Sequence, residues 1–244
     1  MIGIAALMLR VQAKSDAARA LGDVPDAARA RQAAAAAAAA FDAAWAALRP
    51  AEEALGALAC APGCAACCHQ HVAVLPVEAV AIADRLLADG AATRDLQARV
   101  RDVAARVATM DRSSRRAARV ACAFLDASEG CAIYAVRPLR CRGVHSRDVG
   151  HCTIPRTIRR AEPPGTAAHP PPVVPMPPLQ LADAALAGLA EAAAAVGMAV
   201  DSLELGLAVD LLLAAPARIH GVLGGHDRLA EAHLADMPST VAKP

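Results

Sequence analysis

Eight cysteines constrain this 244-residue chain more than any other feature of its sequence. Four lie in the stretch CAPGCAACC, as Cys60, Cys64, Cys67 and Cys68. Three more, Cys122, Cys131 and Cys141, form a second block, and Cys152 follows it. The N-terminal stretch MIGIAALML has no basic residue before its apolar run, unlike a secretory signal, so we expect a cytoplasmic protein. Where thiols stay reduced, clustered cysteines favour a metal site over disulfides.

The spacing within each block indicates how the thiols are presented. Residues 60–64 contain Pro and Gly, which interrupt a helix, so a loop should open the first block. Cys64, Cys67 and Cys68 stand at i, i+3 and i+4 and can share one face of a helical turn. In the second block, DASEG predicts a turn, CAIYAV has strand propensity, and Pro138 ends it. Such a module can fold back toward the first block.

Composition predicts a mainly α fold. Hydrophobic residues make up 56% of the chain, but much of this is alanine and aromatics are only 2%. Alanine is the strongest helix former, and helices with small residues pack closely. We therefore expect a small cysteine-rich, metal-stapled domain with a short β-like element, flanked by alanine-rich helices.

Helical periodicity and the usual terminal residues divide the chain further. We expect one or two helices over residues 15–49 with a stop or restart at Pro50, a helix from Pro76 to near Gly90, and a further helix with an apolar stripe over 96–110. Asp201 and Glu204 form a capping-box pattern before LGLAVDLLLA. The predicted organisation is N-terminal helices over 1–58, a cysteine domain over 59–152, a proline-rich linker over 153–178 and a C-terminal helical lobe over 179–244.

Charge and motif content argue against several classes of function. The formal net charge is +1 and aromatic residues are scarce, so we expect no nucleic acid partner. No apolar run is long and uninterrupted enough for a membrane span, and we expect no membrane partner. The chain has no glycine-rich phosphate loop and no HExxH motif, so nothing in it assigns an enzyme activity.

The cysteine pattern resembles the YkgJ-type cysteine-cluster family, a zinc- or iron-chelating domain. The resemblance runs from Cys60 to about Cys152 and rests on CxxxCxxCC followed by CAFL, CAIY and RPLRCR. It implies a metal-chelating protein with zinc or iron as the bound ion. The implied ligands are the cysteines of the two blocks: Cys60, Cys64, Cys67, Cys68, Cys122, Cys131 and Cys141. Cys152 lies beyond the core motif and receives no ligand role.

Basic and imidazole side chains surround these thiols. Four thiolates on one Zn²⁺ leave two negative charges, which guanidinium groups near Cys141 can neutralise, although the same arginines can equally lie in solvent. These are Arg137, Arg140 and Arg142. Eight thiols suffice for two four-sulfur sites, so the neighbouring histidines are placed outside the coordination sphere. These are His69, His71, His145 and His151.

Two alternatives remain open at this stage. The spacing Cys60-x3-Cys64-x2-Cys67 is that of the cluster loop in radical SAM enzymes, which favours an iron–sulfur protein with a redox or modification-enzyme role. The strand-poor sequence does not offer the alternating pattern of their barrel. A redox switch between Cys67 and Cys68 ranks last, because a disulfide between adjacent residues is strained.

Overall fold

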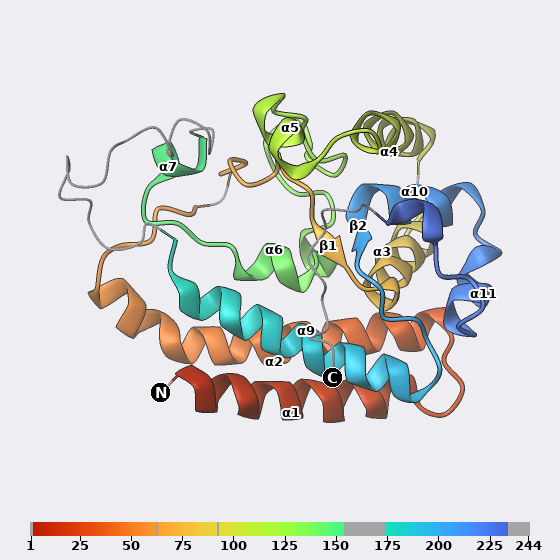
Figure 1. The fold of residues 1–244 in the computed structure, drawn as a ribbon, viewed down its shortest axis with the longest axis horizontal. Helices are drawn as coiled ribbons and strands as arrows, with labels where there is room; N and C mark the ends of the chain where they lie inside the picture. Colours follow the sequence, from red (N-terminus) through yellow and green to blue (C-terminus); the bar gives the residue numbers. More distant parts are fainter. Residues whose placement is uncertain (1, 62, 92, 154–173, 234–244) are drawn as a thin grey trace.

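The computed structural model describes residues 2–61, 63–91, 93–153 and 174–233, and its elements are mainly helices (Figure 1). The long helices are α1 (Ile2–Leu21), α2 (Ala27–Ala54), α3 (Pro76–Ala88), α4 (Arg94–Val107), α9 (Met176–Ala195) and α10 (Leu205–Ala214). The short ones are α5 (Arg112–Ala117), α6 (Leu139–Gly143), α7 (Val149–Thr153) and α11 (Arg218–Leu223), with 3₁₀ turns η1 (Tyr134–Val136) and η2 (Ala230–Ala232). Strands β1 (Ala73–Val74) and β2 (Leu203–Glu204) complete the set. The mainly α fold with a short β element is confirmed.

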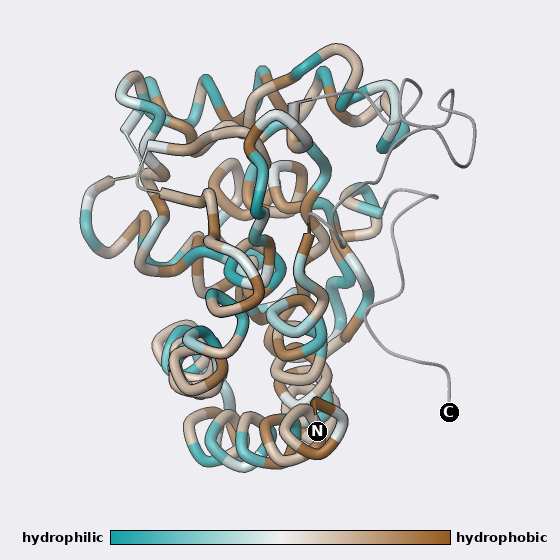
Figure 2. The backbone as a smooth tube through the Cα atoms, turned by 90° about the vertical axis from the view of Figure 1, so that its left-hand side faces the viewer, coloured by the Kyte–Doolittle hydropathy of each residue, from teal (hydrophilic) through white to brown (hydrophobic). Residues whose placement is uncertain are grey.

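Three alanine-rich helices form the base of the molecule. Helices α1, α2 and α9 run side by side along the lower edge of Figure 1 and pack on one another. Their contact is close: a Cβ on Gly188 of α9 would collide with the backbone of Arg10 and Lys14 in α1. Hydrophobic and hydrophilic residues alternate along the helices in Figure 2. The apolar faces of all three helices belong to one buried cluster that also takes in α3, α4 and α10.

The cysteine-bearing segments lie above this base. Helix α6 packs directly on α9, and a Cβ on Gly143 would come within 2.6 Å of the Ala182 Cβ. Strands β1 and β2 pair antiparallel, with Ala73 opposite Glu204. This pairing joins the segment after the first cysteine block to the C-terminal helices. The segment that follows the first cysteine block is therefore attached to the C-terminal helices through this strand pair.

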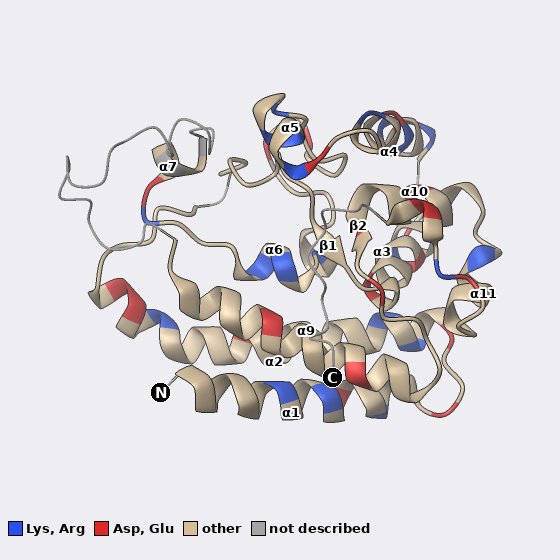
Figure 3. Cartoon of the chain, viewed as in Figure 1, with Lys and Arg blue, Asp and Glu red and all other residues tan. Residues whose placement is uncertain are grey.

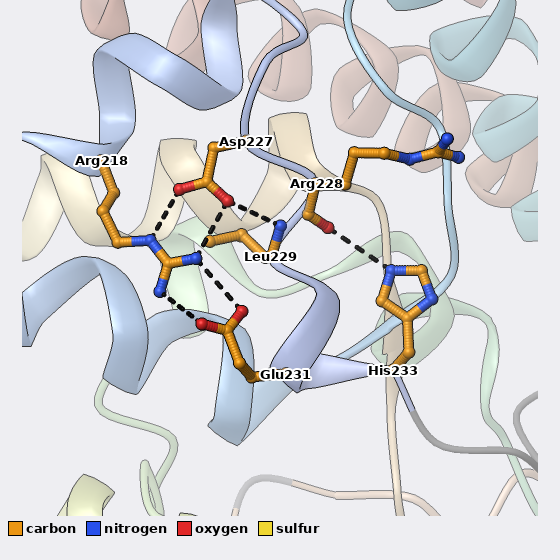
Figure 4. Close-up of polar contacts among 6 residues, drawn as sticks. All are labelled: Arg218, Asp227, Arg228, Leu229, Glu231 and His233. Atoms are coloured by element: carbon orange, nitrogen blue, oxygen red, sulfur yellow. Dashed lines mark hydrogen bonds and ion pairs between the residues drawn. The ribbon is translucent and has the colours of Figure 1, made fainter.

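The C-terminal helices are fixed to one another by ion pairs. Figure 4 shows the Arg218 guanidinium facing two carboxylates, with Nε to the Asp227 Oδ2 at 2.6 Å and Nη2 to the Glu231 Oε2 at 3.1 Å. The backbone N–H of Leu229 donates to the Asp227 Oδ1 at 2.9 Å. Arg228 pairs with Asp201 at 2.6 Å. These contacts hold the segment after α11 against the loop before β2.

Several local predictions hold. Helix α3 starts at Pro76, and Gly90 beyond its end has a φ of 64°. Helix α4 buries Leu96, Val100 and Val107 of the predicted apolar stripe. Most of the proline-rich linker predicted over 153–178 lies outside the described residues. The four segment boundaries stay a prediction.

Three local predictions are wrong. Helix α2 continues through Pro50 to Ala54 with neither a stop nor a restart there, because the proline removes only one backbone donor near the end of a 28-residue helix rich in alanine. Asp201 does not cap α10, since it pairs with Arg228, and Glu204 takes that place. The CAIYAV stretch makes only a bridge from Cys131 to Leu125 and then turns into η1, where the Tyr134 N–H bonds the Cys131 carbonyl at 3.0 Å.

No helix in the described ranges combines the length and hydrophobicity that a membrane crossing requires.

Candidate metal centre

The first cysteine block is a pair of consecutive turns. The Cys64 N–H donates to the Ala61 carbonyl at 3.0 Å, and the Cys68 N–H donates to the Ala65 carbonyl at 2.9 Å. These turns stand where the sequence predicted one helical turn for Cys64, Cys67 and Cys68. All eight cysteines of the chain are free thiols and all are partly buried.

Cys60 is held by the loop that follows α6. The Ala59 N–H donates to the Ser146 carbonyl at 2.8 Å, and the Ser146 N–H in turn donates to the Cys60 sulfur at 3.2 Å. The loop itself is tied to the end of α2, because the Arg147 guanidinium bonds the Glu52 carboxylate at 2.8 Å. A backbone N–H aimed at sulfur stabilises the thiolate form that binds metals.

The second block folds onto the first, as the sequence predicts. The Cys122 N–H donates to the Cys68 carbonyl at 2.7 Å, so the two blocks meet through their backbones. The DASEG turn forms around Asp126, whose Oδ1 accepts from the Gly130 N–H at 2.8 Å. This turn brings Cys131 back beside Leu125.

A buried glutamate positions the third cysteine of this block. The Glu78 carboxylate accepts from the Leu75 N–H at 3.0 Å, at the start of α3, and from the Leu139 N–H at 2.9 Å, at the start of α6. One side chain thereby joins two helix starts, and α6 carries Cys141 two residues further on. Burial raises the pKa of Glu78, and the two N–H donors oppose that rise.

The thiols influence each other electrostatically across the two blocks. The Cys68 thiol donates a hydrogen bond to Cys67, which lowers the pKa of Cys67 and raises that of Cys68. Burial raises the pKa of Cys122 to about 11, and burial together with repulsion from Cys122, Cys67 and Cys131 raises the pKa of Cys141. Cys141 is thus influenced by Cys67 of the first block as well as by the other thiols of its own block.

The thiols do not converge on one point in this conformation. Within the described residues, no three His, Cys, Asp or Glu side chains form a group that could hold a metal ion. The four-sulfur cage expected from the sequence is therefore not preformed, and ligation requires the cysteine side chains to rotate. Their donor chemistry nevertheless fits zinc or iron, because soft thiolates are the preferred ligands of both zinc and iron–sulfur centres.

Of the three arginines flanking Cys141, one acts on the thiols. Arg137 lies over the Tyr134 ring at 4.3 Å, and its positive charge opposes the burial-driven rise in the pKa of Cys131. Arg142 instead pairs with Asp42 at 2.8 Å, and Arg140 pairs with Asp183. The last two link α6 to α2 and α9. Figure 3 shows the basic residues of α5 and α6 in the part of the molecule that carries the cysteine segments.

A buried triad beside the second block was missed at the sequence level. The Arg115 Nη1 lies 2.7 Å from the Glu204 Oε1 and 3.1 Å from the His71 Nδ1. All three side chains are buried, and Glu204 also accepts from the Leu207 N–H at 3.0 Å. The sequence showed only a single Glu in an apolar run. No local pattern pairs such a residue with an arginine 89 residues away.

The histidines near the cysteines have varied settings. His71 belongs to the triad and its Nε2 lies 3.0 Å from the Met110 carbonyl. The His145 ring lies against Trp45, with 4.9 Å between ring centroids. Burial lowers the pKa of His69, and it also lowers the pKa of His145.

Two blocks of free thiols joined through a backbone hydrogen bond form a cysteine-rich segment. The family model CxxCxxCC, described as "Putative zinc- or iron-chelating domain", matches residues 59–157, and the resemblance seen in the sequence is confirmed. The family name has two residues between its first two cysteines, whereas this chain has three. No curated protein and no solved structure matches the chain.

Proposed function

We propose that this protein chelates zinc or iron through the thiolates of both cysteine blocks and has no catalytic role of its own. The proposed ligands are Cys60, Cys64, Cys67, Cys68, Cys122, Cys131 and Cys141. The observation that carries the proposal is the backbone contact of 2.7 Å between Cys122 and Cys68, which brings thiols of the two blocks into one neighbourhood. The family match over residues 59–157 supports the same chemistry.

Some neighbouring groups favour the thiolate form of the proposed ligands. Binding requires each ligand thiol to release its proton. Burial raises the pKa of Cys122 and Cys131, and the positive charges of Arg115 and Arg137 partly offset that rise. The Ser146 N–H does the same for Cys60. A bound ion would cross-link the two cysteine blocks, and structural zinc contributes roughly 10 kcal/mol or more to the folding of small domains.

The test is the metal content of the intact chain and of one variant from each block. The protein is purified without oxygen, and zinc and iron are measured by mass spectrometry beside an absorption spectrum. Cys64→Ser and Cys131→Ser should each lower bound metal and melting temperature together. Ser113→Ala, an exposed position on α5, serves as the control and should change neither. A wild-type protein that holds neither zinc nor iron under these conditions would refute the proposal.

The spacing of the first three cysteines favours a second candidate, an iron–sulfur protein with a redox or modification-enzyme role. The same spectrum separates the two, because an iron–sulfur cluster adds visible sulfur-to-iron charge-transfer absorption that bleaches on reduction, whereas zinc adds none.

A further inference from the structure

Helix α1 is apolar on two opposite faces. Its inner face buries Leu9, Ala13 and Ala17, and the helix packs on α2 and α9. The opposite face carries an outer stripe of large apolar residues, each between 61% and 70% exposed: Ile4, Leu7, Met8 and Val11. With 3.6 residues to a turn, the centre of this stripe lies nearly opposite the inner face. A helix that is apolar all round is normally buried all round, so the outer stripe is a candidate contact surface.

The outer stripe differs from the other exposed apolar residues of the described chain. Residues such as Val24 and Leu55 stand alone, and single exposed apolar side chains are normal on a protein surface. The stripe instead gathers four of them within about two turns of one helix, which runs along the lower edge of Figure 1. Together they leave on the order of 500 Å² of apolar surface open, a size at which a patch is often functional.

The spacing of the outer stripe matches a second copy of the same helix. Successive members are three, one and three residues apart, so the pattern reads the same in both directions from a point between Leu7 and Met8. A two-fold axis through that point places a second α1 antiparallel to the first. Leu7 and Met8 of both copies then surround the axis, and Ile4 of each copy lies opposite Val11 of the other. Every member of the stripe thereby meets an apolar side chain.

Charge does not oppose this pairing. Residues 2–9 of α1 include no charged side chain. The next charged residues, Arg10 and Lys14, both bind Glu191 of α9 in their own chain, with the Arg10 Nε 2.6 Å and the Lys14 Nζ 3.0 Å from its carboxylate oxygens. Both cations are thus held on the side of α1 that faces α9, and the stripe itself is free of charge.

We infer that α1 forms an antiparallel helix pair with the α1 of a second copy of this chain. The occupant is a second copy because the stripe is self-complementary about one point, as an isologous two-fold interface requires. Covering the stripe in both copies buries about 1,000 Å², near the lower limit for a specific interface. The dimer should therefore be weak and should dissociate on dilution. The inference goes beyond metal chelation and does not depend on it, since α1 carries no cysteine.

Sedimentation velocity of the full chain tests the pairing, in reducing buffer so that no disulfide joins two copies. The wild type should pass from monomer to dimer between about 1 and 100 μM, as expected for a micromolar dissociation constant. Met8→Glu puts two carboxylates beside the two-fold axis and should leave only monomer over this range. Val24→Glu, at an exposed apolar residue outside the stripe, is the matched control and should dimerise like the wild type.

Mixing Met8→Glu with Met8→Lys gives a readout that a folding defect would not produce. The opposite charges meet across the axis, so the mixture should form a heterodimer although neither variant dimerises alone. The inference is overturned by a wild type that stays monomeric throughout, including one that binds lipid vesicles instead. A dimer that survives Met8→Glu, or a mixture that stays monomeric, overturns it as well. The metal content of the chain is measured separately, so each of these results leaves the proposed function standing.

Discussion

Replacing Glu204 by alanine should be among the most damaging single changes outside the cysteines. The side chains of Glu204 and Arg115 are 2% and 3% exposed, so the substitution leaves a guanidinium buried without its carboxylate. Removing one partner of a buried ion pair costs about 3–5 kcal/mol. The lost hydrogen bond to the Leu207 N–H, which caps α10, adds about 1 kcal/mol. The expected loss of about 4–6 kcal/mol is a large fraction of the stability of an ordinary domain.

Urea unfolding followed by circular dichroism measures this loss. With a slope of about 3 kcal/mol per molar, the Glu204→Ala midpoint should fall by between about 1 and 2 M. Glu231→Ala is the matched control, because that carboxylate pairs with Arg218 while 60% exposed and should cost less than about 1 kcal/mol. A double change, Arg115→Met with Glu204→Leu, removes both charges and should recover most of the loss. Equal midpoints for the two Glu→Ala variants would refute the reasoning.

The remaining predictions concern pH and helix packing. Burial alone would raise the pKa of Glu204, but the hydrogen bond from His71 and the charge of Arg115 bring it below 4.5, so its contribution should be lost as pH falls below 4.5. Glu78 should show the opposite pH dependence. Burial raises its pKa, so the free energy of unfolding should fall as pH rises from 4.5 through the raised value. Glu78→Gln should flatten that slope in urea unfolding at a series of pH values. Gly188→Ala should lower the melting temperature, because α9 cannot approach α1 with a Cβ there, whereas Gly3→Ala, with open space around it, should not.

Sequence reasoning found those parts of the molecule that local patterns determine. The apolar stripe of α4 repeats with a helical period, and the Pro and Gly at the two ends of α3 are residues with known preferences for those positions. Both helices formed as predicted. The meeting of the two cysteine blocks was also predicted, because their spacing and the DASEG turn restrict the chain locally. Metal ligation by the individual cysteines stays a prediction.

The features that were missed depend on distant partners. Strands of two residues have no detectable period, so the pairing of Ala73 with Glu204 could not be seen in the sequence. The same pairing decides that Glu204, rather than Asp201, caps α10 and that its carboxylate meets Arg115. Strand propensity in CAIYAV was overridden because the backbone there turns back on itself after a single bridge.

The separation of 89 residues between Arg115 and Glu204 has a consequence for how the protein is made. A ribosome adding about 5–20 residues per second needs roughly 4–18 s to travel from one to the other. Cys122, Cys131, Cys141 and Cys152 are all added in the first part of that interval, whereas the carboxylate that balances the Arg115 guanidinium is added only at its end. The native partner of the Arg115 guanidinium therefore becomes available only after all eight cysteines are in the chain.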